Sequence, residues 1–104
     1  MIRGTTPTHS FIIPFEIANI SIVSVAYSQN GNVVVEKVIS DCEITVEAGK
    51  TTISTKLTEE ETLDLTAGNV EIQIRLGDST GDRYASDIIK TTVKRLLKDG
   101  VLNG

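Results

Sequence analysis

The chain has 104 residues, of which 39% are hydrophobic and 23% charged, which suits one folded domain and leaves no room for a second independent core. Its formal net charge of -4 argues against nucleic-acid binding, and no stretch approaches the roughly 20 apolar residues that span a bilayer. The single cysteine, Cys42, cannot form a disulfide within the chain, and no basic region followed by an apolar run begins it. We therefore expect a leaderless protein of a reducing compartment.

Seven segments have the β-branched, alternating character of half-buried strands. They are residues 8–13, 20–29, 33–39, 42–48, 51–57, 69–76 and a last one from Arg83 onward. Pro14 ends the first strand, because proline cannot donate to a sheet ladder. Asn30-Gly31 joins the second to the third and Gly49-Lys50 joins the fourth to the fifth, so both pairs are predicted hairpins.

Alternation along these strands assigns the side chains of the core. Those expected inside are Val23, Val25 and Tyr27, then Cys42, Ile44, Val46 and Ala48, then Ile53, Thr55 and Leu57, and finally Val70, Ile72, Ile74 and Leu76. The four aromatic residues, Phe11, Phe15, Tyr27 and Tyr84, are expected to be its large pieces. The first hairpin should place Tyr27 near Val33 across its turn.

Two segments have features of a helix. Thr58 followed by Glu61 is a capping box, and acidic residues favour a helix N-terminus, so we expect a helical turn over 58–63 that joins the two sheets. Residues 86–98 fit either element, since Ser86 and Gly100 could bound a helix. Their β-branched side chains lose rotamer freedom in a helix, which favours a strand.

These elements predict an all-β fold, because their spacing of about 8–12 residues is typical of sandwiches. We expect one immunoglobulin-like β-sandwich over residues 1–104, with six to eight antiparallel strands and one short helical turn near Thr58–Leu63. Residues 1–8 would form an N-terminal arm, and residues 98–104 a C-terminal tail.

Several groups of residues resemble catalytic motifs and fail their requirements. His9 and Ser10 are adjacent on a strand and so point to opposite faces, whereas a nucleophile must lie within hydrogen-bond reach of its base. Residues 48–52, AGKTT, lack the earlier glycine of a phosphate-binding loop and join two strands. Cys42 has no basic neighbour that would activate its thiol.

Two acidic segments also fall short of a site. Residues 59–61, EEE, lie on a capped and exposed turn that keeps all three carboxylates ionised, so they would not work as an acid and base pair. The turn 77–82, GDSTGD, offers Asp78 and Asp82, which supply fewer oxygens than a calcium loop needs. We expect a solvated turn there, and no catalytic residue, cofactor or metal in the chain.

Two segments are candidates for contacts with other proteins. One is the Thr-rich arm, and the other is the locally basic C-terminal stretch, which would complement an acidic patch on a neighbouring subunit. The candidate contact residues are Arg3, Thr5, Thr6, Thr8, Lys90, Lys94, Arg95 and Lys98.

Three stretches carry a resemblance to a known family. They are MIRGTTPTHSFIIPFE, the hairpin VAYSQNGNVVVEK with DC shortly after, and LTEEETLDL…GNVEIQIRL followed by ASDIIKTTVKRLL. Together they resemble small proteins encoded in the structural-gene regions of bacteriophages and prophages of Gram-positive gut bacteria, with a TTP-x-H-x-F-x-x-PF opening. The resemblance covers nearly the whole chain, which is also similar, at lower resolution, to the N-terminal immunoglobulin-like sandwich of phage baseplate upper proteins.

The resemblance implies a virion component and brings no catalytic residues with it. We expect a non-enzymatic structural or adaptor protein that is homo-oligomeric or bound to other phage virion proteins, assembled in the host cytoplasm and released by lysis. Baseplate proteins continue into long receptor-facing regions, whereas this chain ends at Gly104, so a capsid-decorating protein is an alternative. A ligand- or carbohydrate-binding sandwich is the competing class, and its binding face would expose aromatic rings.

Overall fold

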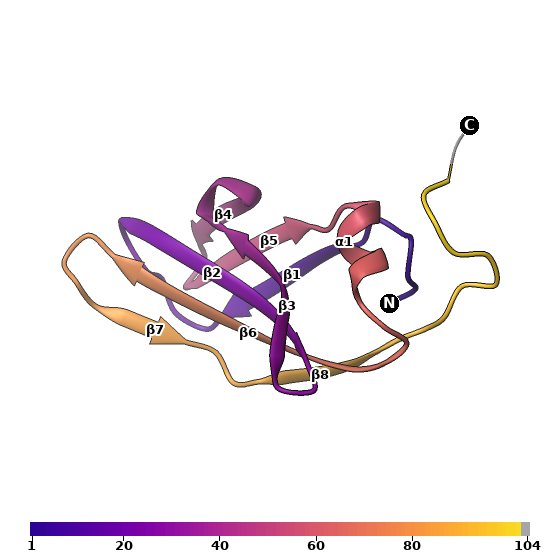
Figure 1. Ribbon diagram of the computed structural model, residues 1–104. Helices are drawn as coiled ribbons and strands as arrows, with labels where there is room; N and C mark the ends of the chain where they lie inside the picture. The colour runs from indigo at the N-terminus through magenta and orange to yellow at the C-terminus, as the bar shows by residue number, and fades with distance from the viewer. Residues whose placement is uncertain (103–104) are drawn as a thin grey trace.

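A computed structural model describes residues 1–102, which contain eight strands in two antiparallel sheets (Figure 1). The elements in chain order are β1 (Thr8–Ile13), β2 (Ile20–Gln29), β3 (Asn32–Val38), a 3-10 turn η1 (Ile39–Asp41), β4 (Cys42–Glu47), β5 (Lys50–Lys56), α1 (Glu59–Asp64), β6 (Gly68–Asp78), β7 (Arg83–Ala85) and β8 (Ile89–Val93). The predicted all-β sandwich is confirmed.

The strand order is that of an immunoglobulin sandwich. In the described residues, one sheet has the order β1-β5-β4, and the other has the order β3-β2-β6, with β7 and β8 both pairing with β6. The hairpins β2–β3 and β4–β5 each stay within one sheet, while the β1–β2, β3–β4 and β5–β6 connections cross between sheets. The smaller sheet thus corresponds to immunoglobulin strands B, E and D, and the larger to C′, C, F and G.

The core lies between the two sheets and follows the predicted alternation along β2, β5 and β6. The buried hydrophobic residues are Phe11, Ile17, Val23, Val25, Tyr27, Val35, Ile53, Leu57, Leu65, Val70, Ile72, Ile74, Leu76 and Val93. Tyr27 is the largest side chain that is fully buried. Because aromatic residues are few, this ring and Phe11 supply the bulk that the β-branched side chains lack.

Part of the predicted core is wrong. Phe15 is 48% exposed, and its ring lies 6.0 Å from the partly buried ring of Tyr84 at an open side of the sandwich. Val46 is exposed and Cys42 is half-buried, because β4 is a free edge of the smaller sheet and buries its inward face incompletely.

The first hairpin turns where the sequence predicts and pairs in a different register. Asn30 and Gly31 have φ angles of 52° and 79°, as a type I′ turn requires. A bulge after Tyr27 pairs this residue with Val35, whereas the expected neighbour, Val33, pairs with the next residue of β2. Bulges insert one extra residue in one strand, and alternation alone does not locate them.

The second hairpin turns one residue earlier than predicted. Lys50 already pairs with Glu47, so Ala48 and Gly49 form the turn, with φ angles of 55° and 79°. Alanine is a poor residue for this left-handed conformation, because its Cβ crowds the following carbonyl.

The structure also shows the conformation of the two segments for which a helix was considered, residues 58–63 and 86–98. Thr58 caps α1: its hydroxyl accepts a hydrogen bond from the Glu61 amide at 3.1 Å, and its amide donates to Glu61 Oε1 at 2.8 Å, so the capping box is confirmed. Within residues 86–98, β8 pairs with β6, which confirms a strand for residues 89–93, while residues 95–98 lie beyond it without regular secondary structure. In the part of the chain that the structure describes, no helix has the length and apolar character to cross a membrane.

Replacing Ala48 by asparagine should stabilise the protein. Asparagine tolerates the left-handed conformation and Asn-Gly is a preferred type I′ pair, so we expect the free energy of unfolding to rise by about 0.5–1 kcal/mol in urea denaturation. Ala67→Asn is the matched control, at an exposed loop position with no positive φ, and should change stability by less than about 0.5 kcal/mol. An Ala48 variant no more stable than this control would contradict the strain argument.

Candidate functional site

The N-terminal arm packs against the chain's own C-terminal region. Ile2 and Lys94 form a parallel bridge, in which the Arg3 amide donates to the Lys94 carbonyl at 3.1 Å and the Lys94 amide donates to the Met1 carbonyl at 2.7 Å. The terminal amine donates to the Thr92 carbonyl at 3.0 Å. The two segments predicted to contact partners therefore lie side by side at one end of the domain.

Arg3 is engaged inside the chain rather than free to reach a partner. Its Nε donates to the Leu65 carbonyl at 2.6 Å and its Nη2 to the Leu63 carbonyl at 2.8 Å, while Nη1 pairs with Asp99. The side chain is 19% exposed. The guanidinium satisfies carbonyls at the end of α1, where a cation is also favourable for the helix dipole. The start of the predicted arm is thus docked on the domain by backbone and side-chain hydrogen bonds.

The other predicted contact residues lie on the surface. Thr6, Thr8, Lys90, Lys94, Arg95 and Lys98 are exposed, and the exposed Thr5 donates its hydroxyl to the Ile2 carbonyl at 2.6 Å. Sequence reasoning missed two neighbours in the C-terminal segment, which we define as residues 94–102. Leu97 is 95% exposed and Leu102 is 85% exposed. Both leucines have almost their whole apolar surface in water.

A cleft of about 320 Å³ opens where the end of β1 faces β7. Its lining includes Ile12, Ile13, Pro14, Phe15, Tyr84 and Asp87. Ile12 is 63% exposed, so the cleft presents apolar surface to solvent. In the described residues β1 pairs with β5 alone and β7 with β6 alone, so both walls of this intersheet cleft are free strand edges.

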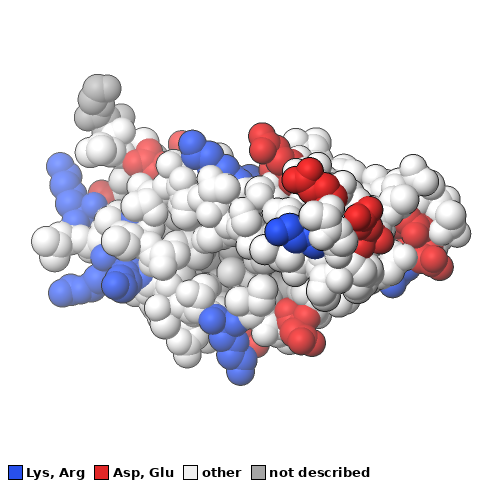
Figure 2. Space-filling view, turned by 180° about the vertical axis from the view of Figure 1, so that it is seen from behind, with Lys and Arg blue, Asp and Glu red and all other residues white. Residues whose placement is uncertain are grey.

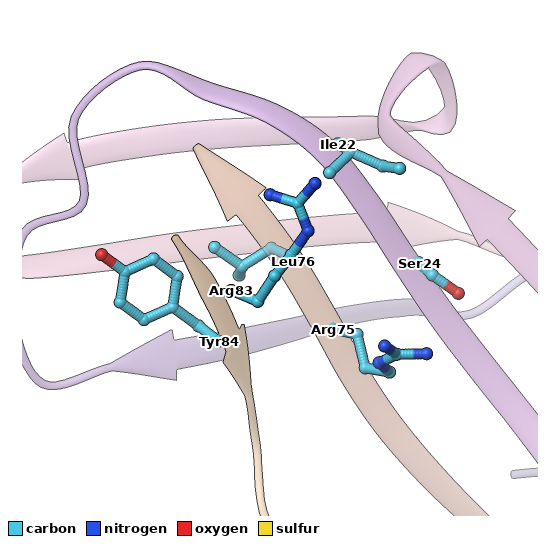
Figure 3. Close-up of a pocket in the computed structure, with 6 residues that line it drawn as sticks. All are labelled: Ile22, Ser24, Arg75, Leu76, Arg83 and Tyr84. Atoms are coloured by element: carbon cyan, nitrogen blue, oxygen red, sulfur yellow. The ribbon is translucent and has the colours of Figure 1, made fainter. Parts of the chain in front are cut away.

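Two carboxylates lie at the intersheet cleft. Asp87 lines it, and the hydroxyl of the cleft residue Tyr84 donates to Asp78 Oδ2 at 3.4 Å. Arg83, next to Tyr84 in the chain, turns toward Ile22 on the outer face of the larger sheet (Figure 3). We call Asp78 and Asp87 the acidic rim of the cleft.

Groups within the turn 77–82 donate hydrogen bonds to the Asp78 carboxylate of the same turn. Asp78 Oδ1 accepts hydrogen bonds from the Thr80 hydroxyl at 2.6 Å, the Thr80 amide at 3.0 Å and the Asp82 amide at 3.1 Å. The hydroxyl of Thr80 is the main cause that lowers the pKa of Asp78 below its ordinary value. Within residues 1–102, no group of three or more His, Cys, Asp or Glu side chains is placed to hold a metal.

The outer face of the larger sheet carries a second hollow, of about 130 Å³, lined in part by Ile22, Ser24 and Arg83 (Figure 3). Figure 3 shows the Arg83 guanidinium turned toward Ile22, while the ring of Tyr84 points away from it. Gly77 makes room for this arginine, because a Cβ there would collide with the guanidinium. Ser24 donates its hydroxyl to Glu36 Oε2 at 2.6 Å, which places a carboxylate beside the hollow.

The free edge formed by β3 exposes valines. Val33 is 61%, Val34 36% and Val38 43% exposed. Natural edge strands are usually protected by charges, proline or a covering segment, because their open backbone groups pair readily with another strand. The run of three valines at 33–35 is a signal that sequence reasoning could have used, since alternation requires at least one of them to face outward.

His9 and Ser10 point to opposite faces of β1, as predicted. Ser10 Oγ lies 2.8 Å from the hydroxyl of Ser54, while His9 Nδ1 and the Tyr27 hydroxyl form a hydrogen bond of 2.7 Å between the two sheets. Burial lowers the pKa of His9 and raises that of Tyr27, so both side chains are neutral near pH 7. The pair therefore joins the sheets as a structural hydrogen bond.

The glutamates of α1 are not equivalent, and this corrects the expectation of three exposed carboxylates. The Glu61 carboxylate receives hydrogen bonds of 2.8 and 3.0 Å from Nζ of Lys37, whose side chain is 8% exposed. Burial alone would raise the pKa of Glu61, but hydrogen bonds from Lys37 and Thr58 together lower it. Glu61 thus neutralises a buried ammonium group between β3 and α1.

The remaining sequence candidates are structural. Burial raises the pKa of the Cys42 thiol, which donates to the Val38 carbonyl at 3.3 Å, so no thiolate is favoured. Residues 48–52 form the second hairpin turn and the start of β5, as predicted. Comparisons of the chain with protein-family models, curated proteins and solved structures found no match.

Arg3→Ala should destabilise the fold. Removing a largely buried guanidinium that satisfies two carbonyls should lower the free energy of unfolding by about 1.5–3 kcal/mol in urea denaturation. Arg3→Lys should recover part of this loss, because an ammonium cannot reproduce the planar fork. The matched control is Arg95→Ala at an exposed arginine, and equal effects of the two alanine variants would contradict the docked arrangement.

Glu61→Gln should destabilise the protein in a pH-dependent way. The amide keeps the shape of the cap and leaves the Lys37 ammonium without its counter-charge, so we expect a loss of about 1–2 kcal/mol near pH 7. Because the folded pKa of Glu61 lies below its ordinary 4.5, its contribution is complete above that value and is lost as pH falls through the folded pKa.

Urea denaturation near pH 7 and near pH 3 measures this difference. The difference in free energy of unfolding between wild type and Glu61→Gln should become smaller at the lower pH. The control Glu60→Gln, at an exposed glutamate, should differ little from wild type at either pH. If the difference for Glu61→Gln stays constant or grows on acidification, the effect comes from packing and not from the lost charge.

Proposed function

We propose that this protein is a non-enzymatic structural or adaptor protein of a bacteriophage particle that acts through protein–protein contacts. One observation carries the proposal: large apolar side chains are exposed on separate parts of one small sandwich. They lie in the intersheet cleft, along β3 and on the C-terminal segment, and include Ile12, Phe15, Val33, Leu97 and Leu102. Grouped exposed apolar surface of this kind is typical of protein interaction sites.

The sheet edges support the same proposal. The free edges at β1, β3 and β7 offer open backbone groups beside exposed apolar side chains. Such edges bind other chains by strand addition, in which the backbone supplies affinity and alternate side chains supply specificity. A domain with accessible edges on different sides can contact more than one neighbour, as an adaptor or a repeated subunit must.

The sequence resemblance supports the phage context. Its opening pattern consists of residues that build the fold: His9 hydrogen-bonds across the sheets, Phe11 is buried and Pro14 follows the end of β1. The opening residues that carry the resemblance are therefore ones that stabilise the fold. A capsid-decorating protein is the closest variant of this proposal, because it uses the same kinds of contact on the head of the particle.

A carbohydrate-binding module is the second candidate, and one observation favours it. Phe15 and Tyr84 place two rings 6.0 Å apart in a cleft that also contains Asp87, and apolar clefts with a few polar groups are the usual form of small-ligand sites. This reading leaves the exposed leucines of the C-terminal segment without a role, so we favour the structural protein.

Phage particles released by the strain that encodes the chain should contain it in many copies. Particles purified by density-gradient centrifugation would be quantified by mass spectrometry against their major capsid protein. The control is an abundant host cytoplasmic protein, which should fall to background through the same gradient. If the chain is expressed during phage production and falls to background with the host protein, the proposed function is wrong.

A further inference from the structure

We propose that the C-terminal segment of one copy docks in the intersheet cleft of a second copy, so that copies join head to tail. This inference rests on the proposed function as an assembly protein and names the partner as another copy of this chain. It assigns a common role to two surfaces that the fold leaves unoccupied at opposite ends of the domain (Figure 1).

The apolar surfaces match in kind and size. Leu97 and Leu102 are 95% and 85% exposed, and the cleft offers the exposed apolar surfaces of Ile12 and Phe15. Its volume of about 320 Å³ exceeds that of a cavity of about 150 Å³ that admits benzene, so it has room for a leucine side chain. Docking would remove both sets of apolar side chains from water.

The charges of the two surfaces are opposite. Lys94, Arg95 and Lys98 accompany the leucines, and the one acidic residue of the segment, Asp99, pairs with Arg3, whereas Asp78 and Asp87 lie at the cleft. On the face seen in Figure 2, blue side chains gather at the end that carries the C-terminal segment, with a few red ones among them, and more of the red side chains lie over the middle and toward the other end. Opposite charges would steer the two ends together and disfavour contact between like ends.

The segment cannot fill the cleft of its own copy. Lys94 is held by backbone hydrogen bonds to Met1 and Arg3, and Leu97 follows only three residues later, a reach of about 10 Å. Leu102 is held beside α1, because its amide donates to Glu59 Oε2 at 3.0 Å. Val93 pairs with Gly68, while the cleft lies near Leu76, eight residues along β6 or about 27 Å away. With these contacts in place, the two leucines can reach the cleft of another copy and not that of their own.

The backbone of the cleft suits an extended guest. Its two walls are the free edges of β1 and β7, and residues 95–102 have no regular secondary structure. The segment's own contacts, Asp99 with Arg3 and the Leu102 amide with Glu59 Oε2, lie at the surface, and docking would exchange those that it displaces. A segment that adds to one edge could alternate its side chains between the cleft and solvent. Where each pair of copies shares one such contact, the contact is heterologous and generates a ring or a filament, whereas an antiparallel pair that exchanges both segments is a closed dimer.

Self-association of the purified chain tests the role of the leucines. Light scattering across a concentration series should show oligomers that weaken as salt rises, since the charges are exposed. Leu97→Asp should raise the midpoint concentration by about tenfold or more, because it removes one buried leucine and places a carboxylate near the acidic rim. The matched control is Val33→Asp, at an exposed valine of β3, which should leave the midpoint unchanged.

Disulfide trapping tests the location of the contact. In a Cys42→Ser background, Leu97→Cys mixed with Ile12→Cys should form a mixed disulfide between copies, detected by mass. Leu97→Cys mixed with Val33→Cys should do so at least tenfold less. Equal trapping at both positions would overturn the inference, as would association that survives Leu97→Asp and is lost in Val33→Asp.

These outcomes are separable from failure of the proposed function. A chain that is present in purified particles but stays monomeric, or associates through β3, keeps the structural function and overturns the head-to-tail contact. A glycan that binds the cleft of wild type and not of Tyr84→Ala, in a chain that stays monomeric, overturns the contact in favour of the carbohydrate-binding candidate. A chain absent from particles overturns the proposed function whatever its association state.

Discussion

The burial of Tyr27 between the two sheets is the constraint on which the rest of the structure depends. Its ring is fully buried, so its hydroxyl needs a partner inside the protein, and His9 on the facing sheet supplies it at 2.7 Å. Tyr27 lies on β2, which takes the place of strand C, where antibody domains bury a tryptophan beside an intersheet disulfide. Here a hydrogen bond takes the place of that link in a chain with one cysteine.

The same packing explains where the exposed apolar surfaces arise. Three strands cover five, and the side where β1 faces β7 is left open, so Phe15 and Tyr84 line a cleft instead of joining the core. The edge strands β3 and β4 bury their inward faces incompletely for a related reason, since each has a neighbour on one side only in the described chain. Exposed apolar surface is thus a consequence of how this small sandwich closes.

Polar contacts fix the ends of the domain and direct what remains free. Arg3 and the backbone around Lys94 tie the N-terminus to the end of α1, which holds the basic C-terminal segment at one end. The acidic rim lies at the other end, near Asp87. A molecule with an apolar, basic end and an apolar, acidic cleft is suited to repeated contacts in one direction, which is what a head-to-tail structural protein requires.

The sequence by itself determined the strands up to β6, the Asn30-Gly31 turn, the cap of α1 and the buried faces of β2 and β6, because these depend on local conformation and alternation. The last predicted strand, from Arg83 onward, is divided into β7 and β8. Tertiary structure decided the rest: the bulge after Tyr27, the exposure of Phe15, the burial of Lys37 against Glu61 and the docking of Arg3. Each brings together residues distant in the chain or depends on which strands meet at an edge. Periodicity shows which side chains share a face, and only the packed sheets show whether that face is covered.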